Sequence, residues 1–315
     1  MTVKIKHIVL IIYIFLNISA TIHSQPVTPQ QRGTLYSFSF NHIYFEADAS
    51  FGGRISSFSL NGRQLLFIKR NGPEDILWGS TYWESPQSTW GWPPSPVLDK
   101  EPYKVCIEND KIVMQSFKDT ITGLVFRKVF YADASSDFVT IEYTIFNKGD
   151  KTISRSGWEV SRVPAGGITF FPAGDGIVTG DGEKEVSTFS RKVKTQNGIR
   201  WYAYSHNDPP ESKFYSDGNE GWLAHLNESG LLFVKQFEDK PVGNFAQNEK
   251  EIEFWLESDE SYMEIENQSE YKELVPGDSL LYTVKWYLFE LPHHIEGKAE
   301  NENLVNFLRT YLKKE

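Results

Sequence analysis

Short runs of alternating apolar and polar residues follow one another from residue 25 almost to the end of the chain. Successive side chains of a strand point to opposite faces of a sheet, so this period is typical of strands with one buried face. Turn residues such as Gly149 and Gly230 separate the runs, which favours antiparallel hairpins. The expected strands are 124–131, 138–147, 153–163, 222–226, 231–237, 251–256, 262–266 and 280–289. The sequence therefore predicts an all-β fold with large antiparallel sheets.

The tail of the chain departs from this pattern. Apolar side chains recur there at helical spacing behind Asn301 and Asn303, two possible caps: Leu304, Val305, Leu308, Tyr311 and Leu312. One C-terminal helix is expected. No interior stretch has the length and composition of a linker, and no repeat of fixed period is present. We therefore expect residues 25–315 to form one domain, a large sandwich or barrel.

The first 24 residues have the order of a secretory signal. Lys4 and Lys6 precede an apolar run from Ile8 to Leu16, and small residues follow near Ala20. The run is much shorter than the roughly 20 residues that span a bilayer, so stable membrane insertion is not expected. This pattern predicts a cleaved signal peptide over residues 1–24 and a periplasmic or secreted protein.

Composition and motifs exclude several function classes. The formal net charge of −10 disfavours a general affinity for nucleic acid phosphates. The single cysteine, Cys106, excludes an intramolecular disulfide and a zinc site built from thiols. The histidines lack metal-ligand spacing, and no phosphate-binding loop, GxSxG or HExxH motif is present. We expect neither a metal nor a cofactor.

The stretch from Trp78 to Pro94, WGSTYWESPQSTWGWPP, contains four of the nine tryptophans. Indole rings stack on the C–H faces of sugars, and carboxylate or amide groups can hydrogen-bond sugar hydroxyls. The stretch is therefore a candidate sugar-binding loop. Its alternative role is a wedge of proline and tryptophan that packs on the core. The candidate binding residues are Trp83, Glu84, Gln87, Trp90 and Trp92.

Two strand-like segments carry candidate polar groups. In RSGWEVSR, Glu159 and Arg162 could hold a polyol or form part of a solvated ion-pair face. In YMEIENQ, Glu264 and Glu266 share a face and could include a general base, although exposed acidic strands are common in acidic proteins. His206, in a stretch rich in turn residues, is the best histidine candidate for an acid or base, or else a surface residue.

Segments at both ends of the chain resemble the galactose mutarotase-like superfamily. ASFGGRISSFSLNGRQLL is similar to its opening hairpin, and MEIENQSEYKELVPGDSLLYTVKWYLFEL is similar to its closing strands. WESPQSTWGWPP and GWEVSRV most resemble an uncharacterised family of exported bacterial proteins, a domain of unknown function on that fold. The resemblance implies a β-supersandwich whose broad concave face binds carbohydrate.

The resemblance also implies roles for particular residues. Glu264 or Glu266 occupies the position of the late-strand glutamate that serves as the base in mutarotases. Arg54, Glu159 and Arg162 become pocket residues, and Glu159 is expected to face one cavity with a late-strand glutamate. Trp158 and Glu159 stand where a mutarotase carries its central histidine, so the usual acid is missing.

Two functions follow as hypotheses. The first is an exported carbohydrate-binding protein, with or without isomerase, lyase or hydrolase activity on a glycan. The alternative is a noncatalytic module for protein contact at the cell surface, with the tryptophan loop as its hot spot. An acidic pocket lined by Trp and Glu would favour the sugar, and a flat aromatic patch would favour the protein.

Overall fold

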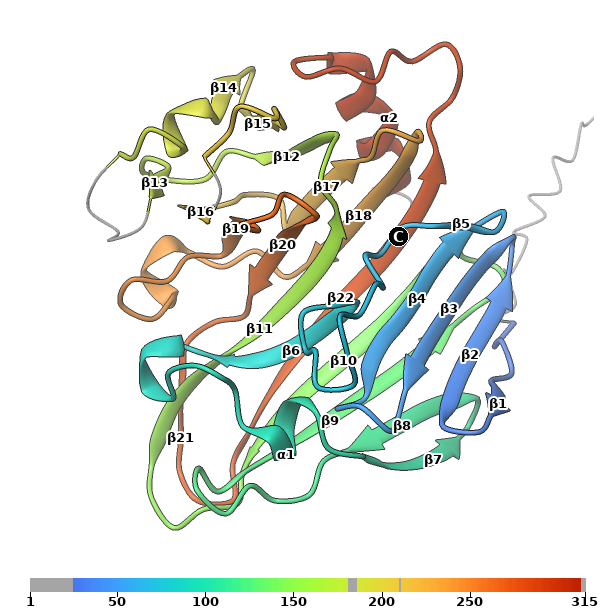
Figure 1. The fold of residues 1–315 in the computed structure, drawn as a ribbon, viewed down its shortest axis with the longest axis vertical. Coiled ribbons are helices and arrows are strands. Elements are labelled where there is room, and N and C mark those ends of the chain that lie inside the picture. Colours follow the sequence, from blue (N-terminus) through green and yellow to red (C-terminus); the bar gives the residue numbers. More distant parts are fainter. Residues whose placement is uncertain (1–24, 181–185, 210, 313–315) are drawn as a thin grey trace, which may run out of the picture.

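The computed structural model describes residues 25–180, 186–209 and 211–312, which form two large antiparallel sheets stacked face to face (Figure 1). The all-β prediction is confirmed. The twelve-stranded sheet has the order β1 (Gln30–Arg32), β2 (Leu35–Phe40), β3 (Ile43–Asp48), β4 (Arg54–Leu60), β6 (Ser80–Ser85), β11 (Ile153–Pro164), β20 (Tyr262–Gln268), β19 (Ile252–Leu256), β16 (Ser212–Ser216) and β13 (Thr179–Gly180), with β5 (Arg63–Gln64) paired to β4 and β21 (Lys272–Leu274) paired to β11.

The ten-stranded sheet supports the first one from behind. Its strands are, in order, β14 (Lys194–Gln196), β15 (Ile199–Ala203), β12 (Ile168–Pro172), β17 (Trp222–Leu226), β18 (Leu231–Phe237), β22 (Ser279–Glu290), β10 (Phe138–Asn147), β9 (Leu124–Ala132), β8 (Lys111–Gln115) and β7 (Lys104–Glu108). Hairpin neighbours such as β9 and β10 pair in a continuous antiparallel register, because the turn residues between them reverse the chain.

The core lies between the two sheets and is strongly aromatic. Phe58 of one sheet approaches Trp286 of the other with ring centroids 5.4 Å apart, and Phe233 contacts the same indole at 4.9 Å. All three side chains are buried. Burying one large apolar side chain contributes about 1.5–3 kcal/mol, so this alternation of apolar residues is what holds the sheets together.

Two helices complete the described fold. α1 (Pro96–Asp99) is a single turn after the tryptophan loop, and α2 (Glu302–Leu312) is the predicted C-terminal helix. Asn301 caps α2, because its Oδ1 accepts a hydrogen bond from the backbone N–H of Asn303. Leu304, Val305 and Leu308 of α2 pack on the outer face of the ten-stranded sheet.

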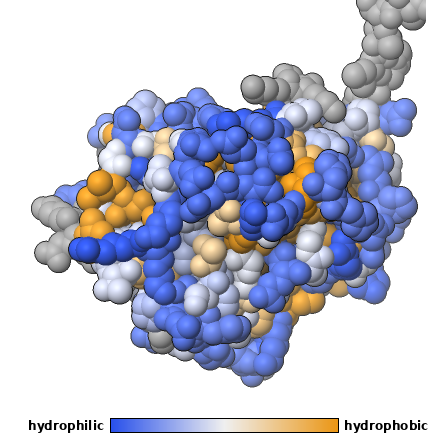
Figure 2. Space-filling view, turned by 90° about the horizontal axis from the view of Figure 1, so that it is seen from above, coloured by the Kyte–Doolittle hydropathy of each residue, from blue (hydrophilic) through white to orange (hydrophobic). Residues whose placement is uncertain are grey.

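The signal peptide predicted over residues 1–24 lies outside the described residues. None of the helices in the described part of the chain is long and apolar enough to cross a membrane. Seen from above the view of Figure 1, the surface is mostly hydrophilic and its apolar areas form separate patches (Figure 2). That a single domain extends from 25 to 315 stays a prediction.

Candidate functional site

A cleft of about 430 Å³ opens on the face of the twelve-stranded sheet that points away from the core. Strands β6, β11, β20, β19 and β16 each place residues in it. Its walls are mainly aromatic and its floor is polar. The lining residues are Leu77, Trp83, Gln87, Trp92, Trp158, Lys213, Tyr215, Trp255, Glu257, Tyr262 and Glu264.

The register between β11 and β20 decides which side chains face the cleft. Arg162 lies opposite Glu264 and Val160 opposite Glu266, and residues directly opposite each other share a face. Both late-strand glutamates therefore point to the cleft side of the sheet, as the alternation in YMEIENQ predicts. Met263 and Ile265 point into the core.

Arg162 and Glu264 form a buried ion pair at the side of the cleft, with Nη2 and Oε1 2.7 Å apart. The guanidinium also lies over the rings of Trp83 and Tyr262, at 5.4 Å and 5.9 Å from their centroids. Burial acts to lower the pKa of Arg162, but Glu264, Tyr262 and Asp99 together outweigh it and the pKa is raised. Arg162 therefore stays charged and keeps Glu264 in place at the cleft surface.

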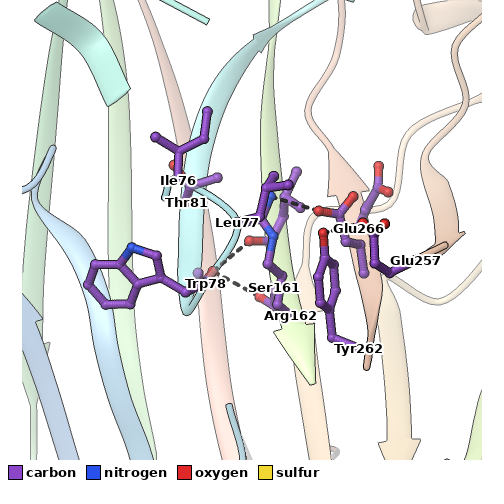
Figure 3. A network of polar contacts seen from close by, with 12 residues as sticks. Ile76, Leu77, Trp78, Thr81, Ser161, Arg162, Glu257, Tyr262 and Glu266 are labelled. Carbon is purple, nitrogen blue, oxygen red and sulfur yellow. Dashed lines mark hydrogen bonds and ion pairs between the residues drawn. The ribbon is translucent and has the colours of Figure 1, made fainter. Parts of the chain in front are cut away.

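Tyr262 connects this pair to a second carboxylate, Glu257. Its hydroxyl donates to Glu257 Oε2 at 2.5 Å, and Figure 3 shows the tyrosine ring between Arg162 and Glu257. Burial acts to raise the pKa of Glu257, but hydrogen bonds from Ser258 and Tyr262 lower it below its usual value. Glu257 is thus an ionised acceptor at the cleft.

A cluster of Lys213, Glu253, Glu266 and Trp158, which we call the cleft cluster, lies at the cleft floor. Lys213 Nζ is 2.7 Å from Glu253 and 3.3 Å from Glu266, and its charge faces the Trp158 ring at 4.7 Å. Trp158 Nε1 donates to Glu266 Oε2 at 2.8 Å. Burial raises the pKa of Glu266 to about 7, although Lys213 acts against it. Glu266 can therefore gain or lose a proton near neutral pH.

The tryptophan loop forms one wall of the cleft. Trp83, Gln87 and Trp92 line it, as predicted, and Trp92 is 54% exposed. Trp90 packs edge-on against Trp83 and donates its Nε1 hydrogen bond to the backbone carbonyl of Glu84. Trp90 thus anchors the loop while Trp83 and Trp92 face the cleft, and sugar binding by the loop stays a prediction.

Arg54 was predicted to be a pocket residue, and the structure corrects this. Its side chain is completely buried and binds Asp99 at 2.8 Å and the backbone carbonyls of Ile76 and Trp78. Asp99 in turn accepts a 2.7 Å hydrogen bond from Trp83 Nε1. Arg54 therefore braces the cleft wall from behind and does not line the cavity.

Glu159 and Glu84 also lie on the wrong face for the predicted roles. Glu159 points into the core and contacts Tyr143, Lys235 and Trp286, so the cavity expected to join it to a late-strand glutamate does not exist. The reason is the strand alternation, which gives the cleft face to the neighbouring tryptophan, Trp158. Glu84 is likewise buried on the face opposite Trp83, and burial raises its pKa to about 7.

His206 is not part of the cleft. Its side chain is 87% exposed and lies beside Tyr204 and Glu260, and none of the described residues that line the cleft is a histidine. This exposure agrees with the alternative that His206 is a surface residue. A polar stretch rich in turn residues does not indicate which face of the protein its histidine will occupy.

Sequence reasoning missed Lys213, Tyr215, Trp255 and Glu257. β16 and β19 bring them to the cleft by pairing beside β20, with Trp255 directly opposite Glu264. Their alternation with Phe214 and Phe254 marked which of them share a face. These side chains reach the cleft because their strands lie beside β20, and this strand order cannot be predicted from a single sequence.

Comparisons with known proteins agree with this architecture. Residues 36–289 match the profile of a family described as domain of unknown function (DUF4380). No curated protein matches.

Solved structures with the same fold include a galactose mutarotase-like protein from Clostridium acetobutylicum, with 12% identity, a TM-score of 0.54, and coverage of 85% of this chain and 99% of that one. A galactose mutarotase-like protein from Lactobacillus casei has 10% identity, a TM-score of 0.56, and coverage of 81% and 100%. A TPR-domain containing protein from Parabacteroides distasonis has 13% identity and a TM-score of 0.57, over 84% of this chain but only 49% of that one. The galactose mutarotase-like fold expected from the sequence is confirmed.

Proposed function

We propose that this chain, which belongs to the DUF4380 family, is a carbohydrate-binding protein whose ligand occupies the cleft between the tryptophan loop and strand β20. The observation that carries the proposal is the combination of four indoles, from Trp83, Trp92, Trp158 and Trp255, with the carboxylates of Glu257 and Glu264 in one cavity. Indole faces stack on sugar C–H groups, and carboxylates accept hydrogen bonds from hydroxyls.

The depth and polarity of the site support a sugar over a protein partner. A protein-binding patch is expected to be flat and to lack converging polar groups, whereas this cleft has the ion pair of Arg162 and Glu264 at its side and the Lys213 side chain, paired with two buried glutamates, at its floor. The cleft also has a volume within the range of small-molecule sites, about 300–1,000 Å³. The noncatalytic protein-interaction module is therefore the weaker alternative.

The two late-strand glutamates differ in what they could do for a ligand. Glu264 lines the cleft and is held by Arg162, so it is placed to accept a hydrogen bond from a sugar hydroxyl. Glu266 is fully buried, with a pKa of about 7 that suits proton transfer. We therefore assign ligand contact to Glu264, and Glu266 is the candidate for proton transfer in any reaction at the cleft.

Binding is proposed in preference to mutarotation. A mutarotase needs an acid for the ring oxygen as well as a base, and none of the described cleft residues is a histidine. We expect polarimetry on common aldoses to show slow or undetectable mutarotation. Fast mutarotation that is lost in Glu264→Gln or Glu266→Gln would overturn the preference for binding over this chemistry.

Calorimetric titration with a panel of neutral, amino and acidic oligosaccharides tests the proposed function. At least one sugar should bind, and Trp92→Ala should weaken that binding about tenfold because a stacking face is lost. Phe117→Ala is the matched control, since Phe117 is similarly exposed at 52% but lies outside the cleft. A complete absence of binding, or equal losses in both variants, would contradict the proposal.

A further inference from the structure

Strand β7 (Lys104–Glu108) is the last strand of the ten-stranded sheet, and β8 is its one pairing partner among the described residues. It runs along the lower edge of the molecule in Figure 1, with no other element drawn beyond it. Four of its five residues are exposed. Its outer edge therefore offers unpaired backbone N–H and C=O groups to another strand.

The sequence of β7, Lys-Val-Cys-Ile-Glu, is complementary to itself when read in the opposite direction. An antiparallel copy centred on Cys106 places Lys104 opposite Glu108 at both ends. Val105 then lies opposite Ile107, and Cys106 lies opposite the same residue of the second copy. Opposite charges that face each other across an antiparallel pair stabilise it, and like charges destabilise it.

The side chains of β7 fit such a pairing. Cys106 Sγ donates to Glu108 Oε1 at 3.1 Å, so the thiol and the carboxylate share a face as the pairing requires. Ile107 is 46% exposed and would gain an apolar neighbour on the other face. A lysine on an edge strand often prevents pairing, but here Glu108 at the symmetric position removes that repulsion.

We propose that β7 is a dimerisation edge, at which two copies of this chain pair antiparallel about Cys106 and join their ten-stranded sheets into one. The occupant is a second copy because the charge pattern complements itself. The proposal is independent of the sugar cleft, which lies on the other sheet. Association is expected to be weak and salt-sensitive, since exposed ion pairs contribute little individually.

Charge reversal tests the pairing directly. Lys104→Glu places two glutamates opposite each other at both ends, and Glu108→Lys does the same with lysines, so neither variant should dimerise. A mixture of the two variants restores both opposite-charge pairs and should form a heterodimer. Lys272→Glu, an exposed lysine on β21, is the matched control and should dimerise like the wild type. Sedimentation velocity at low salt gives the dimer fraction.

Disulfide trapping at Cys106 reports the register. Directly opposed residues have Cα atoms about 4.5–5.5 Å apart, within the range for a disulfide. Added oxidised glutathione supplies the oxidant: two thiols lose two protons and two electrons to form the disulfide, and the glutathione disulfide becomes two reduced glutathiones. Wild type and Lys272→Glu should cross-link at least about tenfold faster than Lys104→Glu, and Cys106→Ser should not cross-link. Equal rates in wild type and Lys104→Glu, or no dimer in either assay, would overturn the proposal.

Discussion

The two faces of the twelve-stranded sheet each carry a buried glutamate that is paired with a lysine and a tryptophan. On the core side lies the interior cluster of Glu159, Lys235, Trp286, Tyr143 and Asn267, and on the other side lies the cleft cluster. Lysine and glutamate are 3.2 Å apart in the interior cluster and 3.3 Å apart, between Lys213 and Glu266, in the cleft cluster. The chemistry of the two clusters is nearly the same.

They differ in how completely their polar atoms are satisfied. Both oxygens of Glu159 accept hydrogen bonds or ion pairs, and Lys235 also donates to the Ile265 carbonyl and to Asn267. Glu266 Oε1 is buried yet has no hydrogen-bond partner among the described residues. A fully satisfied buried network fixes one structure, whereas an incomplete one beside a cavity is available to a ligand. We therefore expect the interior cluster to stabilise the fold and the cleft cluster to respond to a ligand.

The largest difference is expected when each glutamate is made neutral. Glu159→Gln leaves Lys235 buried without a carboxylate and should lower the free energy of unfolding by about 3–5 kcal/mol. Glu266→Gln leaves Lys213 paired with Glu253 and should lower it by less than about 1 kcal/mol. Urea unfolding at pH 5, where Glu266 is still protonated in the folded state, measures both free energies. Similar losses in the two variants would contradict the difference between the two clusters.

The pH dependence of stability tests the electrostatics of the cleft cluster separately. The folded-state pKa of Glu266 is about 7, above its ordinary value of 4.5, so its contribution to stability is present below pH 4.5 and lost as the pH rises through 7. The glutamine in Glu266→Gln cannot ionise. Relative to the wild type, the free energy of unfolding of this variant should therefore rise between pH 5 and pH 8, by on the order of 2 kcal/mol.

Glu257→Gln is the control of opposite sign for that experiment. The pKa of Glu257 is lowered, so its contribution is present above its unfolded pKa and lost as the pH falls through the folded value. Its variant should be less stable than the wild type near neutral pH and approach it in acid. If the free energy of unfolding changed with pH in the same way in the wild type and in Glu266→Gln, the raised pKa of Glu266 would be contradicted.

A smaller effect is expected within the tryptophan loop. Trp90→Ala removes a packed ring and a hydrogen bond to Glu84, and should lower the free energy of unfolding by about 1–3 kcal/mol. Trp92→Ala, at a half-exposed ring, should change it by less than about 0.5 kcal/mol while weakening sugar binding. Thermal unfolding of the two variants checks this order, and the reverse order would mean that Trp92 rather than Trp90 anchors the loop.

The last prediction concerns the number of thermal unfolding transitions. The interior cluster joins the two sheets, because Glu159 belongs to the twelve-stranded sheet and Lys235 and Trp286 belong to the ten-stranded sheet. We therefore expect residues 25–315 to unfold in a single cooperative step. Differential scanning calorimetry should give one transition. Two separate transitions, or a proteolytic cut that leaves two folded halves, would contradict the single domain.

The sequence predicted the fold class because alternation is a local signal that each strand carries by itself. It also predicted that Glu264 and Glu266 share a face, which needs knowledge of one strand only. It failed for Glu159 and Glu84, because alternation says which residues share a face but not which face is the core. In both segments the cleft face belongs to the neighbouring tryptophan, Trp158 or Trp83, and the glutamate lies on the opposite face.

The remaining half of the site depends on strand order. Lys213 and Trp255 reach the cleft because β16 and β19 pair beside β20, a tertiary arrangement that no local pattern encodes. The brace from Arg54 to Asp99 has the same origin, since it joins a strand to a helix 45 residues further along the chain. The roles of such residues can be assigned only once their contacts in the folded protein are known.

A crystal structure of the protein with the tightest-binding sugar from the panel tests the central claim most directly. A sugar ring should lie against Trp92 and Trp255, with hydroxyls donating to Glu257 and Glu264, and the interior cluster should be unchanged around Glu159. A sugar bound elsewhere on the molecule, with the cleft left empty, would contradict it.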